Sequence, residues 1–426
     1  MCGIAGLLIT EKNPEHKVSE TVLQEMSNRL THRGPDDAGI WCSDEGEIGL
    51  VHRRLAILDL SEAGAQPMPS HCGRFITVFN GEIYNHLDLR MALEGGQGAI
   101  AWRGHSDTET LLAGISHWGL SETLKRSYGM FALAVWDVEK RTLSLARDRM
   151  GEKPLFMAQL GNSLAFASEL PALRTLPGFP VSFNFDAAAS QISTGVVPDK
   201  SCILEGVFKV APGTVLTISA GSGKRSELVY ETFGQLVQQG RALCSSTTKV
   251  SQTAAEEMEN VLNEVVASQM VSDVPLGSFL SGGVDSSLIT SLMQVNSKRS
   301  VKTFSIGFAD AGYDESVHAE AVAQHLGTDH QTFRLREDDV LEIIPELASI
   351  YGEPFADSSQ IPTLLLCREA RKHVTVALTG DGGDEIFGGY NRHVLAPKLW
   401  GRVSKMPAFA RRAGTFLGKV LSSRSD

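Results

Sequence analysis

The sequence has no long uninterrupted run of apolar residues. No stretch reaches the roughly 18 consecutive apolar residues that a membrane-spanning helix requires. The N-terminus also lacks a basic segment followed by a long apolar core and a small-residue cleavage site. We therefore expect a cytoplasmic protein with neither a membrane span nor a secretory signal.

Cysteine and positive charge are both scarce. The chain has 6 cysteines in 426 residues, and none of them form a Cys-X-X-Cys pair. Neither a zinc site nor a disulfide framework is therefore indicated. Lysine and arginine number 39 against 50 aspartates and glutamates, a net charge of −11. This balance argues against a nucleic-acid partner and against an anionic membrane surface.

The first 200 residues combine strand and helix patterns, without internal repeats or low-complexity tracts. Short runs rich in β-branched and aromatic residues predict strands, and apolar residues at helical spacing predict helices. The strand patterns are at 75–84, 130–137 and 142–148, and the helical patterns at 19–30 and 107–119. We predict an α+β domain of layered β-sheets flanked by helices over residues 1–200.

The second half of the chain has a different organisation. Residues 160–245 continue to look strand-like, and we expect 201–250 to be a strand-rich connection ending in a Ser/Thr/Gln-rich linker. Met258, Val261 and Val265 have the spacing of an amphipathic helix. Apolar strand patterns at 278–283, 302–308 and 373–380 follow. This pattern predicts that residues 251–426 form an α/β domain with a parallel sheet and a ligand at the carboxyl ends of its strands.

The segment FLSGGVDSS (279–287) stands between a predicted strand and a helical run. Its glycines allow backbone N–H groups to approach an anion at the start of the helix, where the helix dipole favours negative charge. Asp285 would repel phosphates unless a divalent cation lies between them. A glycine turn with a helix cap is the alternative, but the full context after a strand favours an anion loop.

The segment LTGDGGDEIFGGY (378–390) is a second glycine-rich loop after an apolar strand. It gathers Asp381, Asp384 and Glu385, which could share Mg²⁺ with phosphates or steer an incoming amine. Gly-Asp runs also form ordinary turns. Two such loops on one predicted sheet favour a functional role.

The N-terminal half carries the motifs MCGIAG, HRGPDDAG, HRRLAILDL, FNGEIYNH and HSDTE in that order. Together they resemble a class II, N-terminal-nucleophile glutamine amidotransferase domain. SGGVDSS resembles the pyrophosphate loop of the ATP pyrophosphatases, and TGDGGDE follows it. The whole chain therefore resembles the glutamine-hydrolysing asparagine synthetase family.

The resemblance implies that Cys2 is the nucleophile, exposed with a free α-amino group once Met1 is removed. An α-amine with pKa near ~8 can act as the general base beside the thiol. The Asn80 side chain and the Gly81 backbone N–H match the family's oxyanion hole. His32, His52 and His105 are interpreted as structural, because this mechanism does not need them.

The same resemblance implies a pocket for the substrate glutamine. Arg54 matches the position that binds the α-carboxylate, for which a bidentate guanidinium is suited. Asp107 matches the acceptor of the α-ammonium, with Glu82 nearby. Leu55 and Ile57 complete the implied pocket.

For the second domain the resemblance implies ATP and Mg²⁺ as cofactors. Asp285 and Asp384 become the Mg²⁺–pyrophosphate contacts, and Asp381 occupies the position linked to forming an acyl-adenylate. Several asparagine synthetases carry Glu at that position, whereas this chain has Asp381. This difference bears on the identity of the acceptor. The implied ATP-binding residues are Leu280, Ser281, Gly282, Gly283, Asp285, Ser286, Ser287, Ile306, Thr379 and Gly380.

The synthetase domain departs from the family pattern at its C-terminal end. In full-length relatives it continues well past the Gly-Gly-Tyr segment, whereas this sequence ends at Asp426, so we expect a C-terminally truncated domain. A fragment, a disrupted gene and one part of a split enzyme all remain open. The family also commonly forms homodimers.

The leading hypothesis is therefore synthesis of asparagine from aspartate, glutamine and ATP. One alternative keeps the chemistry with another carboxylate acceptor, such as a sugar uronate of a surface polysaccharide. Another is a bare glutaminase or a non-catalytic ATP-binding remnant. A nucleic-acid-modifying pyrophosphatase would share SGGxDSS, but the acidic balance and the N-terminal domain argue against it.

Overall fold

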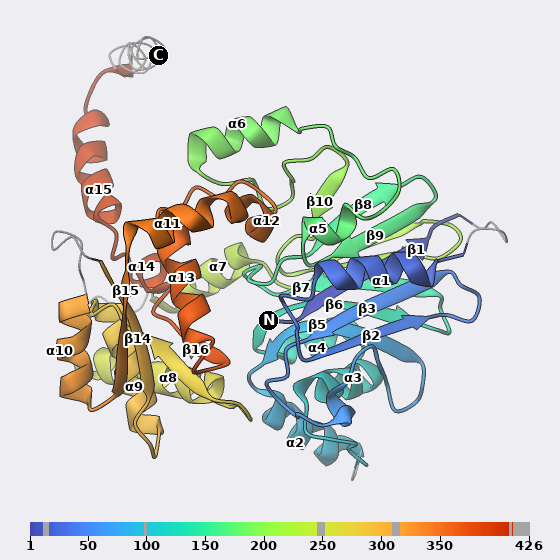
Figure 1. Ribbon diagram of the computed structural model, residues 1–426, viewed down its shortest axis with the longest axis horizontal. Helices are drawn as coiled ribbons and strands as arrows, with labels where there is room; N and C mark the ends of the chain where they lie inside the picture. Colours follow the sequence, from blue (N-terminus) through green and yellow to red (C-terminus); the bar gives the residue numbers. More distant parts are fainter. Residues whose placement is uncertain (12–16, 98–99, 245–251, 309–315, 409–410, 412–426) are drawn as a thin grey trace. The chain divides into compact units, whose positions relative to one another are not determined.

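The strand-like stretches of the N-terminal half form two six-stranded antiparallel sheets in the computed structural model (Figure 1). The structure describes residues 1–11, 17–97, 100–244, 252–308, 316–408 and 411. The chain divides into two units. Unit 1 comprises Met1–Leu276 and Phe333–Val376, and unit 2 comprises Gly277–Thr332 and Ala377–Asp426. Both antiparallel sheets belong to unit 1.

The two sheets of unit 1 interleave early and late strands. The first has the order β10-β8-β9-β1-β3-β2 and the second β12-β11-β7-β6-β5-β4. The strands of the first sheet are β1 (Gly3–Ile9), β2 (Asp37–Cys42), β3 (Ile48–Arg54), β8 (Phe156–Leu160), β9 (Ser163–Ala167) and β10 (Val207–Lys209). Those of the second are β4 (Met68–Pro69), β5 (Phe75–Ile83), β6 (Gly129–Asp137), β7 (Thr142–Arg147), β11 (Thr214–Ser219) and β12 (Arg225–Val229).

Strand β6 shows how sequence alternation builds the core of unit 1. Successive side chains of a strand point to opposite faces of the sheet. Ala132, Ala134 and Trp136 belong to an apolar cluster shared with β1 and β3 of the other sheet. Phe131 and Leu133 belong to a second cluster that includes residues of the covering helices. Both faces of the strand are therefore buried, and the main core lies between the two sheets.

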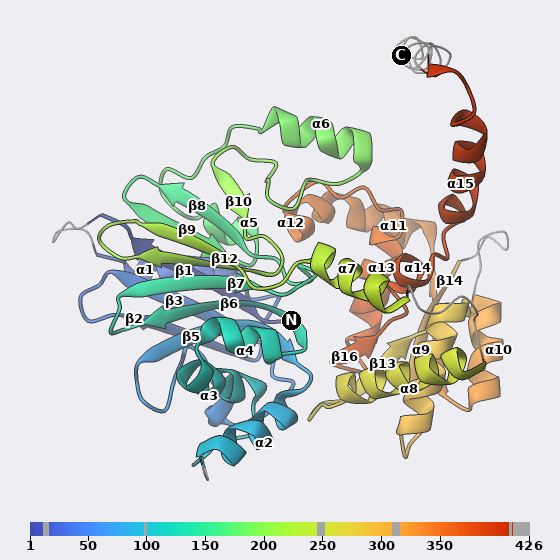
Figure 2. The ribbon, with the colours of Figure 1, turned by 180° about the vertical axis from the view of Figure 1, so that it is seen from behind.

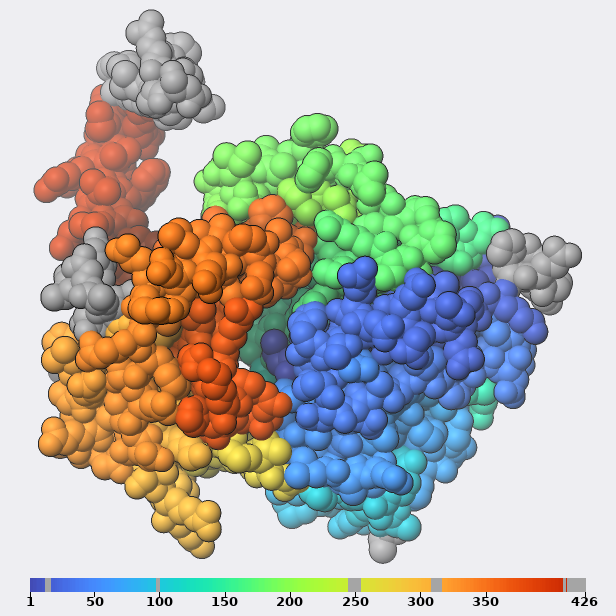
Figure 3. All heavy atoms as spheres, viewed as in Figure 1, coloured from blue at the N-terminus to red at the C-terminus, as the bar shows by residue number. Residues whose placement is uncertain are grey.

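Helices cover the outer faces of these sheets, which gives unit 1 a helix–sheet–sheet–helix layering (Figures 1 and 2). Residues of α1 and α5 pack on the first sheet, and residues of α2, α3 and α4 pack on the second. Helix α1 lies on the face of unit 1 that is seen in Figure 3, in blue. The bounds are α1 (Glu20–Arg29), α2 (His86–Gln97), α3 (Asp107–Trp118), α4 (Leu120–Arg126) and α5 (Leu170–Leu173).

The predicted α/β region forms a four-stranded sheet of order β15-β14-β13-β16. Strands β13 and β14 are parallel, with Gly277 opposite Lys302, and α9 connects them. The strands are β13 (Leu276–Phe279), β14 (Lys302–Phe308), β15 (Asp329–Leu335) and β16 (Val376–Leu378). The helices of unit 2 are α9 (Val284–Asn296), α10 (Ser316–Leu326), α14 (Gly383–Phe387) and α15 (Asn391–Val403).

The expectation that 160–245 is strand-like throughout was wrong. Strands β9 to β12 lie there, but α5 and α6 (Phe185–Thr194) stand between β9 and β10, and α7 (Phe233–Cys244) follows β12. Helix α7 takes up the first part of the expected linker, and 245–251 lie outside the described residues. Asn184 caps α6 by accepting a hydrogen bond from the backbone N–H of Ala187, a local signal that the strand interpretation overlooked.

The predicted amphipathic helix is present as α8 (Gln252–Gln269), but its buried face differs from the prediction. Met258 and Val261 are exposed to 45% and 59%, whereas Val266 is buried. The remaining helices of unit 1 are α11 (Glu337–Ile343), α12 (Leu347–Tyr351) and α13 (Gln360–Ala370). Among all described residues, no helix has both the length and the apolarity of a membrane span.

Candidate active site

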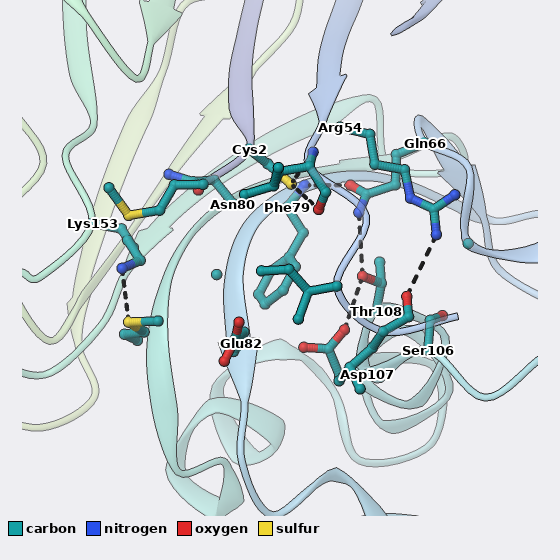
Figure 4. Close-up of a pocket in the computed structure, with 17 residues that line it drawn as sticks. Cys2, Arg54, Gln66, Phe79, Asn80, Glu82, Ser106, Asp107, Thr108 and Lys153 are labelled. Carbon is teal, nitrogen blue, oxygen red and sulfur yellow. Dashed lines mark hydrogen bonds between the residues drawn. The ribbon is translucent and has the colours of Figure 1, made fainter. Parts of the chain in front are cut away.

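One cavity of unit 1 gathers all the residues predicted to act on glutamine. Cys2 directly precedes β1 and Arg54 ends β3 of the first sheet, whereas Asn80 and Glu82 come from β5 of the second. In Figure 4 Arg54 and Lys153 lie at opposite ends, with Cys2 and Asn80 between them. The predicted residues that line this cavity are Cys2, Arg54, Leu55, Ile57, Asn80, Gly81, Glu82 and Asp107.

The Cys2 thiol lies at the start of β1 and is fixed by its neighbours. The Leu55 backbone N–H points at the Cys2 Sγ across 3.5 Å, and Arg33 Nε donates to the Cys2 carbonyl oxygen at 2.8 Å. Burial raises the pKa of the Cys2 thiol. A thiol in this environment is protonated at neutral pH, so it needs a base before it can act as a nucleophile.

An α-amine in this environment is well suited to be that base. Burial is the main reason that the pKa of the Met1 ammonium falls to about 6, and the positive charges of Arg33 and Lys153 act in the same direction. The Met1 amine is therefore mostly neutral at pH 7, and we expect the same direction of shift for the α-amine that Cys2 carries once Met1 is removed.

Asn80 provides an unused hydrogen-bonding group in the cavity wall. Its side chain is fully buried, and neither the Oδ1 nor the Nδ2 atom has a hydrogen-bond partner among the described residues. An unpaired buried amide costs about 1–3 kcal/mol. An unpaired amide N–H in the cavity wall can stabilise the oxyanion of a transition state without first breaking another hydrogen bond.

Gly81 is required at its position by the close approach of β5 and β6. A Cβ atom there would lie 2.2 Å from the Met130 carbonyl oxygen and 2.7 Å from the Phe131 Cα atom. Any side chain would separate the strands that carry Asn80 and Met130 into the cavity.

Arg54, the last residue of β3, is buried and held by backbone carbonyls. Its Nη1 atom donates to the Ser61 oxygen at 3.0 Å, and its Nη2 atom donates to the carbonyl oxygens of Leu58 and Asp59. A guanidinium has five N–H groups, so two are left without a partner among the described residues. Those two can meet a carboxylate.

Two carboxyl groups in the cavity favour a cationic ligand. Asp107, the first residue of α3, accepts a hydrogen bond from the Ile83 backbone N–H at 2.9 Å, yet burial raises its pKa. Burial and then the charge of Asp107 raise the pKa of Glu82 to about 7. An ammonium group bound between them would relieve this unfavourable burial of negative charge.

Two further cavity residues, Gln66 and Lys153, were missed by the sequence interpretation. Gln66 is buried, and its Oε1 atom accepts a hydrogen bond from the Phe79 backbone N–H at 2.7 Å. Lys153 is only 5% exposed, and its Nζ atom lies 2.7 Å from the Met130 thioether sulfur. Neither residue belongs to a recognisable motif, because the packing of distant strands brings them to the cavity.

The residues predicted to bind ATP all lie in unit 2. Ser281 to Gly283 connect β13 to α9, and Gly282 adopts a φ of +81°. A Cβ atom on Gly282 would lie 2.7 Å from the His318 backbone, so the loop lies directly against α10. Leu280, which donates its backbone N–H to the Phe304 oxygen, and Ile306 lie on adjacent strands of the sheet.

The second glycine-rich loop packs against the first. A Cβ atom on Gly380 would lie 2.6 Å from the Ser286 backbone nitrogen. The Ser286 hydroxyl bonds to Ser281 within the loop, and the buried Ser287 hydroxyl has no partner among the described residues. Thr379 Oγ1 donates to Asp381 Oδ2 at 3.0 Å.

The two aspartates predicted to bind metal lie on either side of this loop contact. A Cβ atom on Gly383 would meet the Asp285 carboxylate at 2.6 Å, and Asp384 lies next to Gly383 in the chain. No group of three or more candidate metal ligands occurs among the described residues. Mg²⁺ in nucleotide sites usually takes only about one or two carboxylates together with phosphates and waters, so such a site needs no larger cluster of protein ligands.

Comparison with known proteins assigns both halves of the chain. The family described as "Glutamine amidotransferase domain" matches residues 1–230, and "Asparagine synthase" matches 257–426. "Asparagine synthetase [glutamine-hydrolyzing] 1" of Bacillus subtilis is 33% identical over 405 residues, which cover 95% of this chain and 61% of that protein. A Mycobacterium tuberculosis relative, provisionally named a glutamine-hydrolyzing asparagine synthetase, is 35% identical over 403 residues, or 92% of this chain and 60% of its own.

A provisionally named asparagine synthetase of Methanocaldococcus jannaschii is 34% identical over 441 residues, which cover 98% of this chain and 81% of that protein. The chain thus spans about 60% of the length of the Bacillus and Mycobacterium relatives. The solved B. subtilis glutamine phosphoribosylpyrophosphate amidotransferase has 16% identity and a TM-score of 0.40, covering 84% of this chain and 94% of that one. That likeness is too distant to support the fold.

Proposed function

We propose that this chain, which belongs to the glutamine-hydrolysing asparagine synthetase family, releases ammonia from glutamine at Cys2 and uses ATP to activate an acceptor carboxylate. Aspartate is the proposed acceptor, and asparagine, glutamate, AMP and pyrophosphate are the products. The observation that supports the proposal most strongly is that Cys2 and the unpartnered Asn80 amide line one cavity with Arg54 and Asp107.

In the proposed glutaminase reaction Met1 is first removed, which leaves the α-amine on Cys2. This amine takes the thiol proton as Sγ attacks the glutamine amide carbon, and Asn80 and Gly81 stabilise the oxyanion. The C–N bond then breaks, the leaving nitrogen takes up the proton as ammonia, and water hydrolyses the thioester. Arg54 binds the α-carboxylate, and Asp107 with Glu82 accepts the α-ammonium.

In the proposed synthetase reaction the acceptor carboxylate attacks ATP and displaces pyrophosphate. Backbone N–H groups at the start of α9 bind the phosphates, with the hydroxyls of Ser281 and Ser287 as further donors. Asp285 and Asp384 would hold Mg²⁺, which would neutralise phosphate charge there. Asp381 lies beside Thr379 where the adenylate forms. Ammonia then displaces AMP.

Pyrophosphate exchange into ATP tests both the adenylation and the acceptor. We expect exchange with aspartate, and a roughly ten-fold or greater loss in Gly282→Ala, because the added Cβ strains a left-handed residue against α10. Glutamine hydrolysis in the same preparation verifies that the variant is folded. Pyrophosphate exchange with a sugar uronate but not with aspartate would show that the uronate is the acceptor. Glutamine hydrolysis without any pyrophosphate exchange would show that the chain only releases ammonia.

Lys153→Met is expected to change the pH dependence of glutamine hydrolysis. The Lys153 ammonium lowers the pKa of the Met1 α-amine, and we expect it to act in the same direction on the Cys2 α-amine, which is active only when deprotonated. Removing the charge raises that pKa, so the acidic limb of kcat/KM should move upward by roughly half to one pH unit. Activity should fall near pH 6 and recover in alkaline buffer.

Lys209→Met is the matched control for this experiment. Lys209 is a second sheltered lysine of unit 1, but it pairs with Glu353 at 2.6 Å and does not line the cavity. Its removal should leave the pH profile in place. A Lys153→Met profile that coincides with that of the parent would refute the assigned electrostatic role.

A further inference from the structure

Asp273 contacts a loop beside the glutamine cavity from a part of the chain far removed in sequence. It follows α8 and precedes β13, and it lies within unit 1. Its carboxylate Oδ2 atom accepts a hydrogen bond from the Asp59 backbone N–H at 2.7 Å. Its own backbone N–H donates to the Ile57 oxygen at 3.0 Å. Asp273 therefore fixes both sides of residue 58 in the cavity loop 57–61.

This loop supplies the carbonyl groups that hold Arg54. The oxygens of Leu58, Asp59 and Ser61 all accept hydrogen bonds from the Arg54 guanidinium. The loop conformation is demanding, because Asp59 has a φ of +57°, in the left-handed region that non-glycine residues seldom adopt. A residue that fixes the Asp59 backbone therefore also fixes the direction of the Arg54 donors.

A histidine completes the contact on the other side. His105 Nε2 lies 2.7 Å from Asp273 Oδ2, and the His105 backbone N–H donates to the buried Asp59 carboxylate at 2.8 Å. Asp59 also accepts from the Ser61 backbone N–H at 3.2 Å. His105 thus bonds to both Asp59 and Asp273 and supports the conformation of the loop.

We propose that Asp273 is a positioning residue for glutamine: through Asp59 and its loop it aligns Arg54 with the α-carboxylate of the substrate. The inference rests on the proposed glutaminase function. It adds a residue from outside the matched amidotransferase segment 1–230 to the glutamine site. Because Asp273 acts on binding in both the ground state and the transition state, its loss should raise KM rather than lower kcat.

Asp273→Ala provides the direct test. Loss of a charged hydrogen-bond acceptor for the loop should raise the KM for glutamine about ten-fold, with kcat within about two-fold of the parent. Asp273→Asn retains an oxygen that can accept from Asp59, so its KM should stay within about three-fold. The Asp273 side chain is 39% exposed and its backbone bond to Ile57 survives both substitutions, so both variants should fold, as melting temperature will verify.

Asp339→Ala is the matched control. Asp339 likewise accepts hydrogen bonds from the backbone N–H and the side chain of one residue, Arg336, but has no contact with loop 57–61. Its removal should leave KM unchanged. An unchanged KM in Asp273→Ala would overturn the inference. The same change in kcat and KM in Asp273→Ala and Asp339→Ala would also overturn it.

Glutamine binding to Cys2→Ala protein, measured by calorimetry, separates this inference from the proposed function. If the parent hydrolyses glutamine and the Cys2→Ala/Asp273→Ala double variant binds it as tightly as Cys2→Ala alone does, only the inference fails. If the parent neither hydrolyses nor binds glutamine, the proposed function and the inference fail together. About ten-fold weaker binding in the double variant supports the positioning role even without turnover.

Discussion

Replacement of Cys2 by alanine is expected to abolish glutamine hydrolysis, with a loss of at least about 10⁴-fold in kcat. Alanine removes the only thiol among the described residues that line the cavity, since the other sulfurs there are the thioethers of Met1 and Met130. The Arg33 side chain donates to the residue 2 carbonyl oxygen, which alanine keeps, and the Leu55 N–H loses only its contact with Sγ, so the pocket itself should persist. Ammonia production from glutamine, measured with purified protein, provides the test.

Two comparisons make the Cys2 experiment specific. Cys2→Ser keeps the volume and supplies a much weaker nucleophile, so it should also lose almost all hydrolysis. Any ATP-dependent amidation supplied with free ammonia should continue in both variants, because the nucleotide loops belong to unit 2. Equal glutaminase rates in Cys2→Ala and the parent would contradict the assigned chemistry.

Asn80→Ala is expected to lower kcat for glutamine hydrolysis by about 10²–10³-fold, with KM within a few-fold. The Asn80 amide is fully buried and has no partner among the described residues, so its removal should not break an existing bond. The loss should therefore appear where negative charge develops on the substrate oxygen. Steady-state kinetics of ammonia release separate kcat from KM.

The controls for Asn80 use charge and position. Asn80→Asp places a carboxylate against the developing oxyanion and should be at least as inactive as the alanine variant. Asn85→Ala removes an amide that bonds to the Arg126 oxygen and the Tyr128 N–H, outside the cavity, and should retain glutaminase activity. A larger effect on KM than on kcat in Asn80→Ala would assign this residue to ground-state binding.

Local patterns predicted most of the regular structure correctly. The run rich in β-branched and aromatic residues at 130–137 and the helical spacing in 107–119 are confirmed as β6 and α3, because both signals lie within the element itself. The same reasoning was wrong over 160–245 and for the buried side of α8. In those places the partner that an element packs against is distant in sequence, and periodicity carries no information about it.

The glutamine cavity shows the same division. Cys2, Arg54 and Asn80 stand in motifs that can be identified in the sequence, and the structure gathers them around one cavity, while their roles stay predictions. Lys153 and Asp273 stand in no motif linked to this cavity. They approach it only because strands and loops from remote segments pack together.

The sequence by itself determined the family, the alternating strands and the residue types that the proposed chemistry needs. Each of these is a local property or an ordered set of local motifs. Only the tertiary structure decided that Asn80 has no partner among the described residues, that burial lowers the pKa of the Met1 α-amine to about 6, and that Asp273 contacts the loop that holds Arg54. Burial, electrostatics and long-range hydrogen bonds depend on every element that surrounds a group, and no short stretch of sequence contains them.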